Sequence, residues 1–231
     1  MKHLPRLLFA ASLALLAATP TNAGLLDKAK AVKSSIDAAA ERPVKVSIGK
    51  GSLMDNRADT LKVVAAFRKK IGTNPLRVYG MKITRTNQIV MTYQSRYNAE
   101  KLETLVFNNG EIQGKPSPFK LIGNNVKVAD NVFELDPVKL ESIPDLVKMA
   151  REKTAQATKS KALGATVNVV QSWDDGRPVR IVVNVSADDR SALENVGEAL
   201  ESLKSDKVAK GSSVGQLIAD ATGKVIEFRL K

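Results

Sequence analysis

The sequence predicts an α+β protein made of two tandem repeats, each a helix packed on a small antiparallel β-sheet. Along the chain, apolar residues change from helical spacing to alternation, and this change occurs twice in the same order. Each series ends in an apolar strand, a polar turn with glycine and a further strand, at 105–113 and at 217–226. Hydrophobic residues form 43% of the chain, enough to build cores. Chance similarity between two short hairpins is the alternative to a duplication.

The first 23 residues have the pattern of a secretory signal peptide. A basic start with Lys2 and Arg6 precedes the apolar run 7–18, and small residues at 21–23 offer a cleavage site. The apolar run is shorter than the roughly 20 residues of a transmembrane helix, although a retained membrane anchor is the alternative. We therefore expect a chain that is soluble after signal-peptide removal, in the periplasm or secreted.

The rest of the chain is long enough for two units of about 100 residues each. We expect an N-terminal repeat over 24–123 with a leading amphipathic helix, and a linker over 124–136. A C-terminal repeat should follow over 137–231 and contain an inserted helix at 191–204. The chain has no cysteine, so packing alone must hold both repeats together.

Local signals place the elements of the N-terminal repeat. Asp55 or Asn56 can cap a helix that runs to about Ile71, and Gly72 lies just past its end. Asn109-Gly110 is the strongest short hairpin signal of the chain. The other expected elements are a helix ended by Pro43 and strands over 44–48, 76–84, 88–94 and 104–108. Alternation along 76–84 predicts one face shared by Arg77, Tyr79, Met81 and Ile83.

The C-terminal repeat is expected to replay this order. Pro144 can start a helix that runs to about Thr158. Two strands joined by the turn Asp174-Asp175-Gly176 should follow it, and a final hairpin should close the chain around Ala221-Thr222-Gly223. The expected strands are 165–173, 179–185, 216–220 and 224–228.

The closing hairpin carries a resemblance to a known family. Asp220-Ala-Thr-Gly-Lys-Val-Ile226, after a helix and antiparallel strands in an exported chain, resembles the last strands of PepSY-like periplasmic domains. The resemblance implies a small α+β module of the bacterial envelope that binds or inhibits other proteins, peptidases among them, and it carries over no catalytic residues. The first half departs from the pattern with Asn109-Gly110 in place of Thr-Gly, and the helix 191–204 would be an insertion.

The composition argues against several classes of enzyme. The only histidine, His3, lies in the signal and no cysteine exists, so the mature chain lacks the groups of zinc sites and of Cys-His or Ser-His-Asp machinery. Ser117 and Lys120 have the S-x-x-K spacing but lie in a proline-rich loop, and a turn or a helix cap explains Asp174-Asp175 and Asp188-Asp189. We expect no catalytic residues, no metal site, no cofactor and no enzyme activity. A glycan hydrolase with two carboxylates is the alternative.

Charge points to the class of partner. The formal net charge is +12, which favours anionic partners, although lysine and arginine are scattered through every segment. Aromatic residues form only 4% of the chain, and export also argues against nucleic acid. The candidate partner-binding residues combine arginine with aromatic rings, as interface anchors do. They are Arg77, Arg85, Tyr93, Arg96, Tyr97 and Trp173.

The leading hypothesis is an exported, non-catalytic binding protein that acts by protein–protein contact with an envelope protein. It would inhibit or assist an envelope enzyme. The alternative is a basic envelope component that binds anionic lipid or lipopolysaccharide through the helix with Lys28, Lys30 and Lys33. The sequence leaves open the oligomeric state and whether one sheet continues through both repeats.

Overall fold

The structure of the chain is a computed structural model. It describes residues 42–121, 126–159, 163–172, 176–186 and 215–230. These residues all belong to one compact unit, Ala40–Lys231. The predicted signal peptide, the leading amphipathic helix and the inserted helix 191–204 lie outside the described residues, as does Trp173.

The described elements follow one another in two series, each with a helix followed by antiparallel strands. The first series comprises β1 (Val44–Lys45), η1 (Leu53–Asp55), α2 (Arg57–Ile71), β2 (Arg77–Ile83), β3 (Ile89–Gln94), β4 (Leu102–Asn108), β5 (Glu111–Ile112) and β6 (Ser117–Phe119). The second comprises η2 (Val128–Asn131), β7 (Phe133–Glu134), η3 (Leu140–Ser142), α3 (Ile143–Thr158), β8 (Gly164–Gln171), β9 (Val179–Ser186), β10 (Gly215–Asp220) and β11 (Val225–Leu230).

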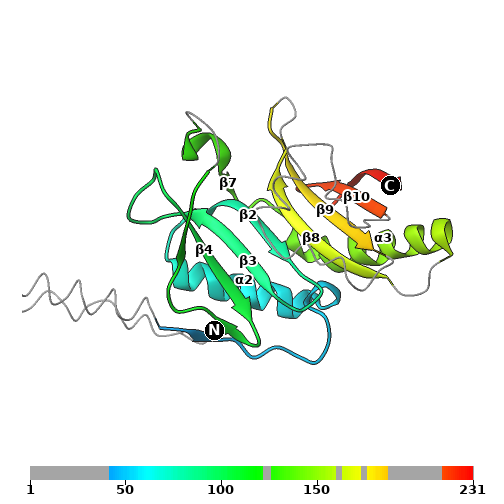
Figure 1. Cartoon of the computed structure of the whole chain (residues 1–231), viewed down its shortest axis with the longest axis horizontal. Coiled ribbons are helices and arrows are strands. Elements are labelled where there is room, and N and C mark those ends of the chain that lie inside the picture. The colour runs from blue at the N-terminus through cyan, green and yellow to red at the C-terminus, as the bar shows by residue number, and fades with distance from the viewer. Residues whose placement is uncertain (1–41, 122–125, 160–162, 173–175, 187–214, 231) are drawn as a thin grey trace, which may run out of the picture. The chain divides into compact units, whose positions relative to one another are not determined.

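The prediction of two tandem repeats, each with its own small sheet, is wrong. The described strands form one 11-stranded antiparallel sheet in the order β1-β5-β4-β3-β2-β8-β9-β10-β11, with β6 on β4 and β7 on β2 (Figure 1). β2 joins β8 from Gly80, opposite Val170, to Ile83, opposite Val167. Both strands are buried over nearly their whole length, as suits the centre of a sheet. The sheet therefore continues past residues 124–136, and β7 within that range adds to it.

The local signals for the ends of α2 and for the Asn109-Gly110 turn are confirmed, whereas the predicted turn at 174–176 lies largely outside the described residues. The Asn56 side chain accepts a hydrogen bond from the Asp59 N–H at 3.1 Å and caps α2, and Gly72 ends the helix with a φ of 70°. Asn109 and Gly110 have φ values of 51° and 80°, the positive pair that a type I′ hairpin turn requires. Short polar residues and glycine thus fix the ends of these elements, as the sequence indicates.

Both helices lie on one face of the sheet, where the main core forms (Figure 1). Phe67 of α2 and Val147 of α3 are fully buried there. Alternate strand residues such as Met81, Phe107 and Val183 meet them from the sheet. The core therefore runs without interruption under both helices, which explains why the strands form one sheet.

A β-bulge changes which residues of β2 face this core. The register of β2 against β3 shifts between Val78 and Gly80, so Met81 and Ile83 face the helices whereas Tyr79 belongs to a smaller cluster on the opposite face. There the Tyr79 ring lies 5.4 Å from the Phe119 ring, centroid to centroid. The predicted common face of Tyr79 with Met81 and Ile83 is wrong, because the extra residue of the bulge interrupts the alternation.

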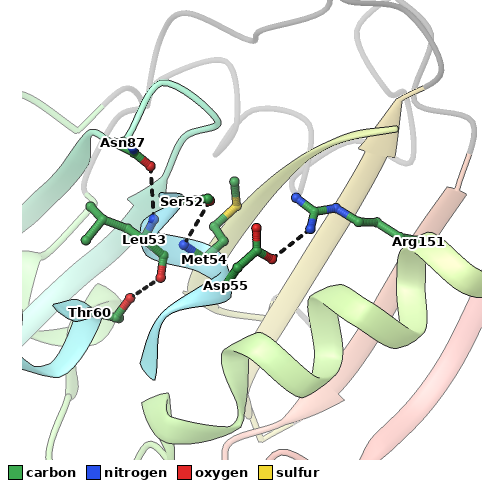
Figure 2. A network of polar contacts seen from close by, with 7 residues as sticks. All are labelled: Ser52, Leu53, Met54, Asp55, Thr60, Asn87 and Arg151. Carbon is green, nitrogen blue, oxygen red and sulfur yellow. Dashed lines mark hydrogen bonds and ion pairs between the residues drawn. The ribbon is translucent and has the colours of Figure 1, made fainter. Parts of the chain in front are cut away.

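A polar network holds the start of α2 to the rest of the unit (Figure 2). In η1, the Leu53 N–H donates to Asn87 Oδ1 in the β2–β3 turn at 2.9 Å, and its carbonyl accepts from the buried Thr60 hydroxyl at 2.5 Å. Asp55 forms an ion pair of 2.7 Å with Arg151 of α3. The short η1 segment therefore touches elements from both series.

Candidate partner-binding surface

The connection between β3 and β4 presents a tyrosine ring to solvent. The Tyr97 side chain is 63% exposed, the highest value among the large hydrophobic residues of the described part. The Arg96 guanidinium carbon lies 4.4 Å from the centroid of this ring, and Arg96 also donates a hydrogen bond to the Tyr97 hydroxyl. An arginine over an aromatic face is an attractive cation–π contact. The two neighbouring side chains therefore hold each other in place.

Hydrogen bonds within the connection fix its backbone. The Ser95 N–H donates to the Lys101 carbonyl at 2.9 Å, and the Lys101 N–H donates to the Asn98 carbonyl at 3.0 Å. The Gln94 side chain donates to the Ala99 carbonyl at 2.8 Å. Tyr97 thus stands on a turn between two strands that hydrogen bonds hold closed.

A carboxylate beneath the turn ties it to the sheet. Tyr93 and Ser95 are buried, and their hydroxyls donate to the two oxygens of Glu103 at 2.9 and 2.8 Å. Burial, followed by the negative charge of Glu103, raises the pKa of the Tyr93 hydroxyl well above its ordinary value. Tyr93 therefore keeps its proton and acts as a support within the core.

The C-terminal end of α2 adds positive charge beside Arg96. A Cβ at Gly72, the residue that ends α2, would lie 3.5 Å from Arg96 Nη1. Lys70, in the last turn of α2, donates to the Arg42 carbonyl at 2.7 Å. Partial burial, followed by the positive charge of Arg96, lowers the pKa of Lys70. We call Lys70, Arg96 and Tyr97 together the Tyr97 surface.

The structure brings some of the predicted residues together and separates others. Arg96 and Tyr97 are in contact, with Tyr93 in the core beneath them. Arg77 is exposed at the start of β2, opposite Glu134 of β7. Arg85 lies in the turn at the other end of β2, where its side chain approaches Gly164 of β8. Among the candidate residues that the structure describes, only Arg96 and Tyr97 therefore form one exposed group.

Sequence reasoning missed Lys70 as a part of the Tyr97 surface and Glu103 as the carboxylate that supports it. The signal for Lys70 is the run Arg68-Lys69-Lys70 just before Gly72, because cations are favoured at the C-terminal end of a helix. Glu103 had no such signal, since its role depends on the register of β4 against β3, which places it opposite Tyr93. Strand register is a non-local property that a short motif does not contain.

The S-x-x-K spacing of Ser117 and Lys120 does not fall on a helix. Ser117 begins β6, which pairs with β4 and ends at Phe119, so Lys120 follows the end of the strand. The chemistry of this motif needs the two side chains on one helical face. The spacing is therefore not matched by the geometry.

Comparisons with known proteins do not assign a function to this surface. No family model, no curated protein and no solved structure matches the chain. The resemblance to PepSY-like domains therefore stays a prediction that rests on the hairpin motif at 220–226. Within the described residues, no helix combines the length and the apolar character needed to cross a membrane.

Proposed function

We propose that this chain is an exported, non-catalytic binding protein that acts in the periplasm by contact with an envelope protein. The observation that carries the proposal is the largely exposed Tyr97 ring, fixed by Arg96 on a hydrogen-bonded turn. Tyrosine and arginine are enriched among the residues that dominate binding energy at protein interfaces. Because both side chains are already held, binding would lose little of their conformational entropy.

Positive charge indicates the chemistry of the partner. Partial burial lowers the pKa of Lys70, and the positive charge of nearby Arg96 lowers it further. Such a pair favours an acidic protein surface, with carboxylates around a depression that accepts the Tyr97 ring. Exposed charges are screened by salt, whereas the apolar contact of the ring is not. An interface of this kind should therefore weaken with salt but persist.

Affinity capture tests this proposal. The chain, exported through its own signal and tagged after Lys231, is used to capture partners from envelope extract at low and at high salt. Mass spectrometry identifies the bound species. We expect one protein in stoichiometric amount at both salt concentrations, and an envelope enzyme would name the process. Anionic lipid or lipopolysaccharide that salt releases would instead support a basic component that binds the membrane surface.

Variants of the Tyr97 surface then locate the contact on the molecule. Tyr97→Ala should weaken binding of the captured protein about 30-fold or more, because truncation of an interface anchor costs about 2 kcal/mol or more. Tyr97→Phe should bind more tightly than Tyr97→Ala, since it keeps the ring. Lys148→Ala removes an exposed lysine of α3 outside the Tyr97 surface. This control variant should bind the captured protein as tightly as the native chain does. Full capture by Tyr97→Ala would contradict the assignment of this surface.

A further inference from the structure

The last strand of the chain lies at an edge of the described sheet. Among the described strands, β11 pairs with β10 alone: residues 227–230 lie opposite 218–215 in regular register, and a β-bulge at Ile226 then brings Val225 opposite Ala219. The side chains of Ile226 and Leu230 are each 51% exposed. An edge strand offers a row of backbone donors and acceptors to any chain that can pair with it.

The strands beside β4 differ from β11 in length and composition. The outer side of β4 is shared by the two-residue β5 and by the three-residue β6, which contains Pro118. β11 has six residues and no proline, and its charged residues Glu227 and Arg229 and the bulge at Ile226 restrict which strands can pair with it. α3 packs over β9 and β10 and also touches β11, with Lys153 over the Phe228 ring. The other end of the described sheet is the two-residue β1, which contains Lys45, so β11 is the longer of the two described edges.

We propose that β11 pairs antiparallel with β11 of a second copy of this chain, around a twofold axis that passes by Phe228. This arrangement sets Phe228 opposite Phe228 of the second copy and Glu227 opposite its Arg229. The two sheets then continue as one, with α2 and α3 of both copies on the same face. This proposal does not depend on the Tyr97 surface, which lies at the β3–β4 connection.

Side-chain positions along β11 support this register. Phe228 faces the helix side, opposite the buried Leu217 of β10, and Lys153 Nζ of α3 lies 5.5 Å from the centroid of its ring. Glu227 and Arg229 alternate with Phe228, so they point to the other face, where they form an ion pair with each other. In the dimer, the two glutamates and two arginines would form one network of alternating charge.

Charge also selects this register among the other symmetric ones. A twofold axis by Glu227 would place the two glutamates opposite each other, and an axis by Arg229 would place the two arginines opposite each other. Like charges directly opposite on neighbouring strands are destabilising. An axis by Ile226 would fall on the bulge, where the ladder of β11 is interrupted. Among these axes, only the one by Phe228 sets opposite charges against each other, and it also pairs the Phe228 ring with its counterpart.

Cysteine cross-linking tests the axis directly, because the chain has no cysteine of its own. Directly opposite residues of antiparallel strands have Cα atoms about 4.5–5.5 Å apart, within the range that a disulfide spans. Phe228→Cys in the full, untagged chain should therefore form a disulfide-linked dimer on mild oxidation. Glu227→Cys should not link to itself, but it should link to Arg229→Cys when the two variants are mixed.

Charge variants test the same register without a covalent bond. Sedimentation equilibrium should give a dimer for the native chain, whereas Glu227→Arg and Arg229→Glu should each lose the dimer because they set like charges opposite. The double variant Glu227→Arg with Arg229→Glu restores opposite pairs and should restore the dimer. Circular dichroism confirms that each variant is folded. A monomeric native chain, as expected if β11 receives a strand of another protein, would overturn the proposal, and so would a dimer that every single variant retains.

Discussion

The half of the sheet that follows α2 and the half that follows α3 differ in what they offer to a partner. In the α2 half, β5 and β6 occupy the outer side of β4, and the most exposed feature is a side chain, Tyr97. In the α3 half, β11 pairs with a single described strand, and the most exposed feature is a strand edge. One continuous sheet can therefore carry two kinds of recognition, by side chains at one end and by backbone at the other.

In the α3 half, the helix approaches the strands closely at two glycines. A Cβ at Gly215 of β10 would lie 2.2 Å from the Thr154 hydroxyl oxygen, and one at Gly223 would lie 2.6 Å from Ser142 Cβ. Thr154 is fully buried and donates to the Ala150 carbonyl at 2.8 Å, so it has little room to move. Glycine is thus required where α3 approaches β10 and the β10–β11 turn.

The largest effect is expected from Gly215→Ala, which should disturb the α3 half and leave the Tyr97 surface intact. Overpacking of this kind costs about 1–3 kcal/mol of the free energy of unfolding, measured by urea denaturation. The double variant Gly215→Ala with Thr154→Ala should recover part of the loss, since it removes the side chain that the new methyl group meets. Gly164→Ala is the matched control, because a Cβ there would meet its nearest atoms at 3.7 Å, an ordinary contact. Equal losses for both single variants would contradict this account.

A second effect belongs to the α2 half and depends on pH. The pKa of Tyr93 is raised in the folded state, so its contribution to stability is complete below its ordinary pKa of 10.0 and is lost as pH rises above that value. There the unfolded chain loses a proton that the folded chain keeps, which removes about 1.4 kcal/mol per pH unit. Tyr93→Phe lacks this dependence. The difference in free energy of unfolding between the native chain and Tyr93→Phe should therefore become smaller between pH 9 and pH 11, about one unit either side of the ordinary pKa.

Urea denaturation at a series of pH values measures this difference, and Tyr97→Phe is the control because its ring is largely exposed. The same titration can be followed by phenolate absorbance. The chain contains 3 tyrosines, and Tyr93 should ionise only when the protein unfolds. A constant gap between the native chain and Tyr93→Phe across this range would show that Glu103 and burial do not hold the proton.

Most elements of the described part could be predicted from the sequence, whereas the sheet could not. Helix caps, glycine turns and alternation are local, and they predicted α2, α3 and both hairpins close to their observed bounds. The pairing of β2 with β8 joins residues more than 80 positions apart, and no motif contains it. Lys82 is an example of this limit, because its charge suggests exposure although it is only 2% exposed at the centre of the sheet.

The candidate site was predicted in part for the same reason. Arg96 and Tyr97 are neighbours in the sequence, so their contact follows from position alone. Tyr93 was grouped with them, yet alternation with Ile89 and Met91 already indicates that it shares their buried face. The support from Glu103 and Lys70 depends on strand register and on the packing of α2, which only the three-dimensional structure supplies.

The smallest effect is expected where ion pairs connect the two halves. Asp55 of η1 and Arg151 of α3 are paired at 2.7 Å, and their side chains are 47% and 30% exposed. Because pairs this open are worth less than about 1 kcal/mol, a double-mutant cycle with Asp55→Ala and Arg151→Ala should give a small coupling energy. The pair of Arg57 with Asp145, whose side chains are 56% and 74% exposed, should give a smaller coupling energy.

Every variant should still unfold in one transition, since pairing of β2 with β8 couples the halves. Two separate transitions after removal of the Asp55–Arg151 pair would instead mean that the ion pair, and not the sheet, joins them.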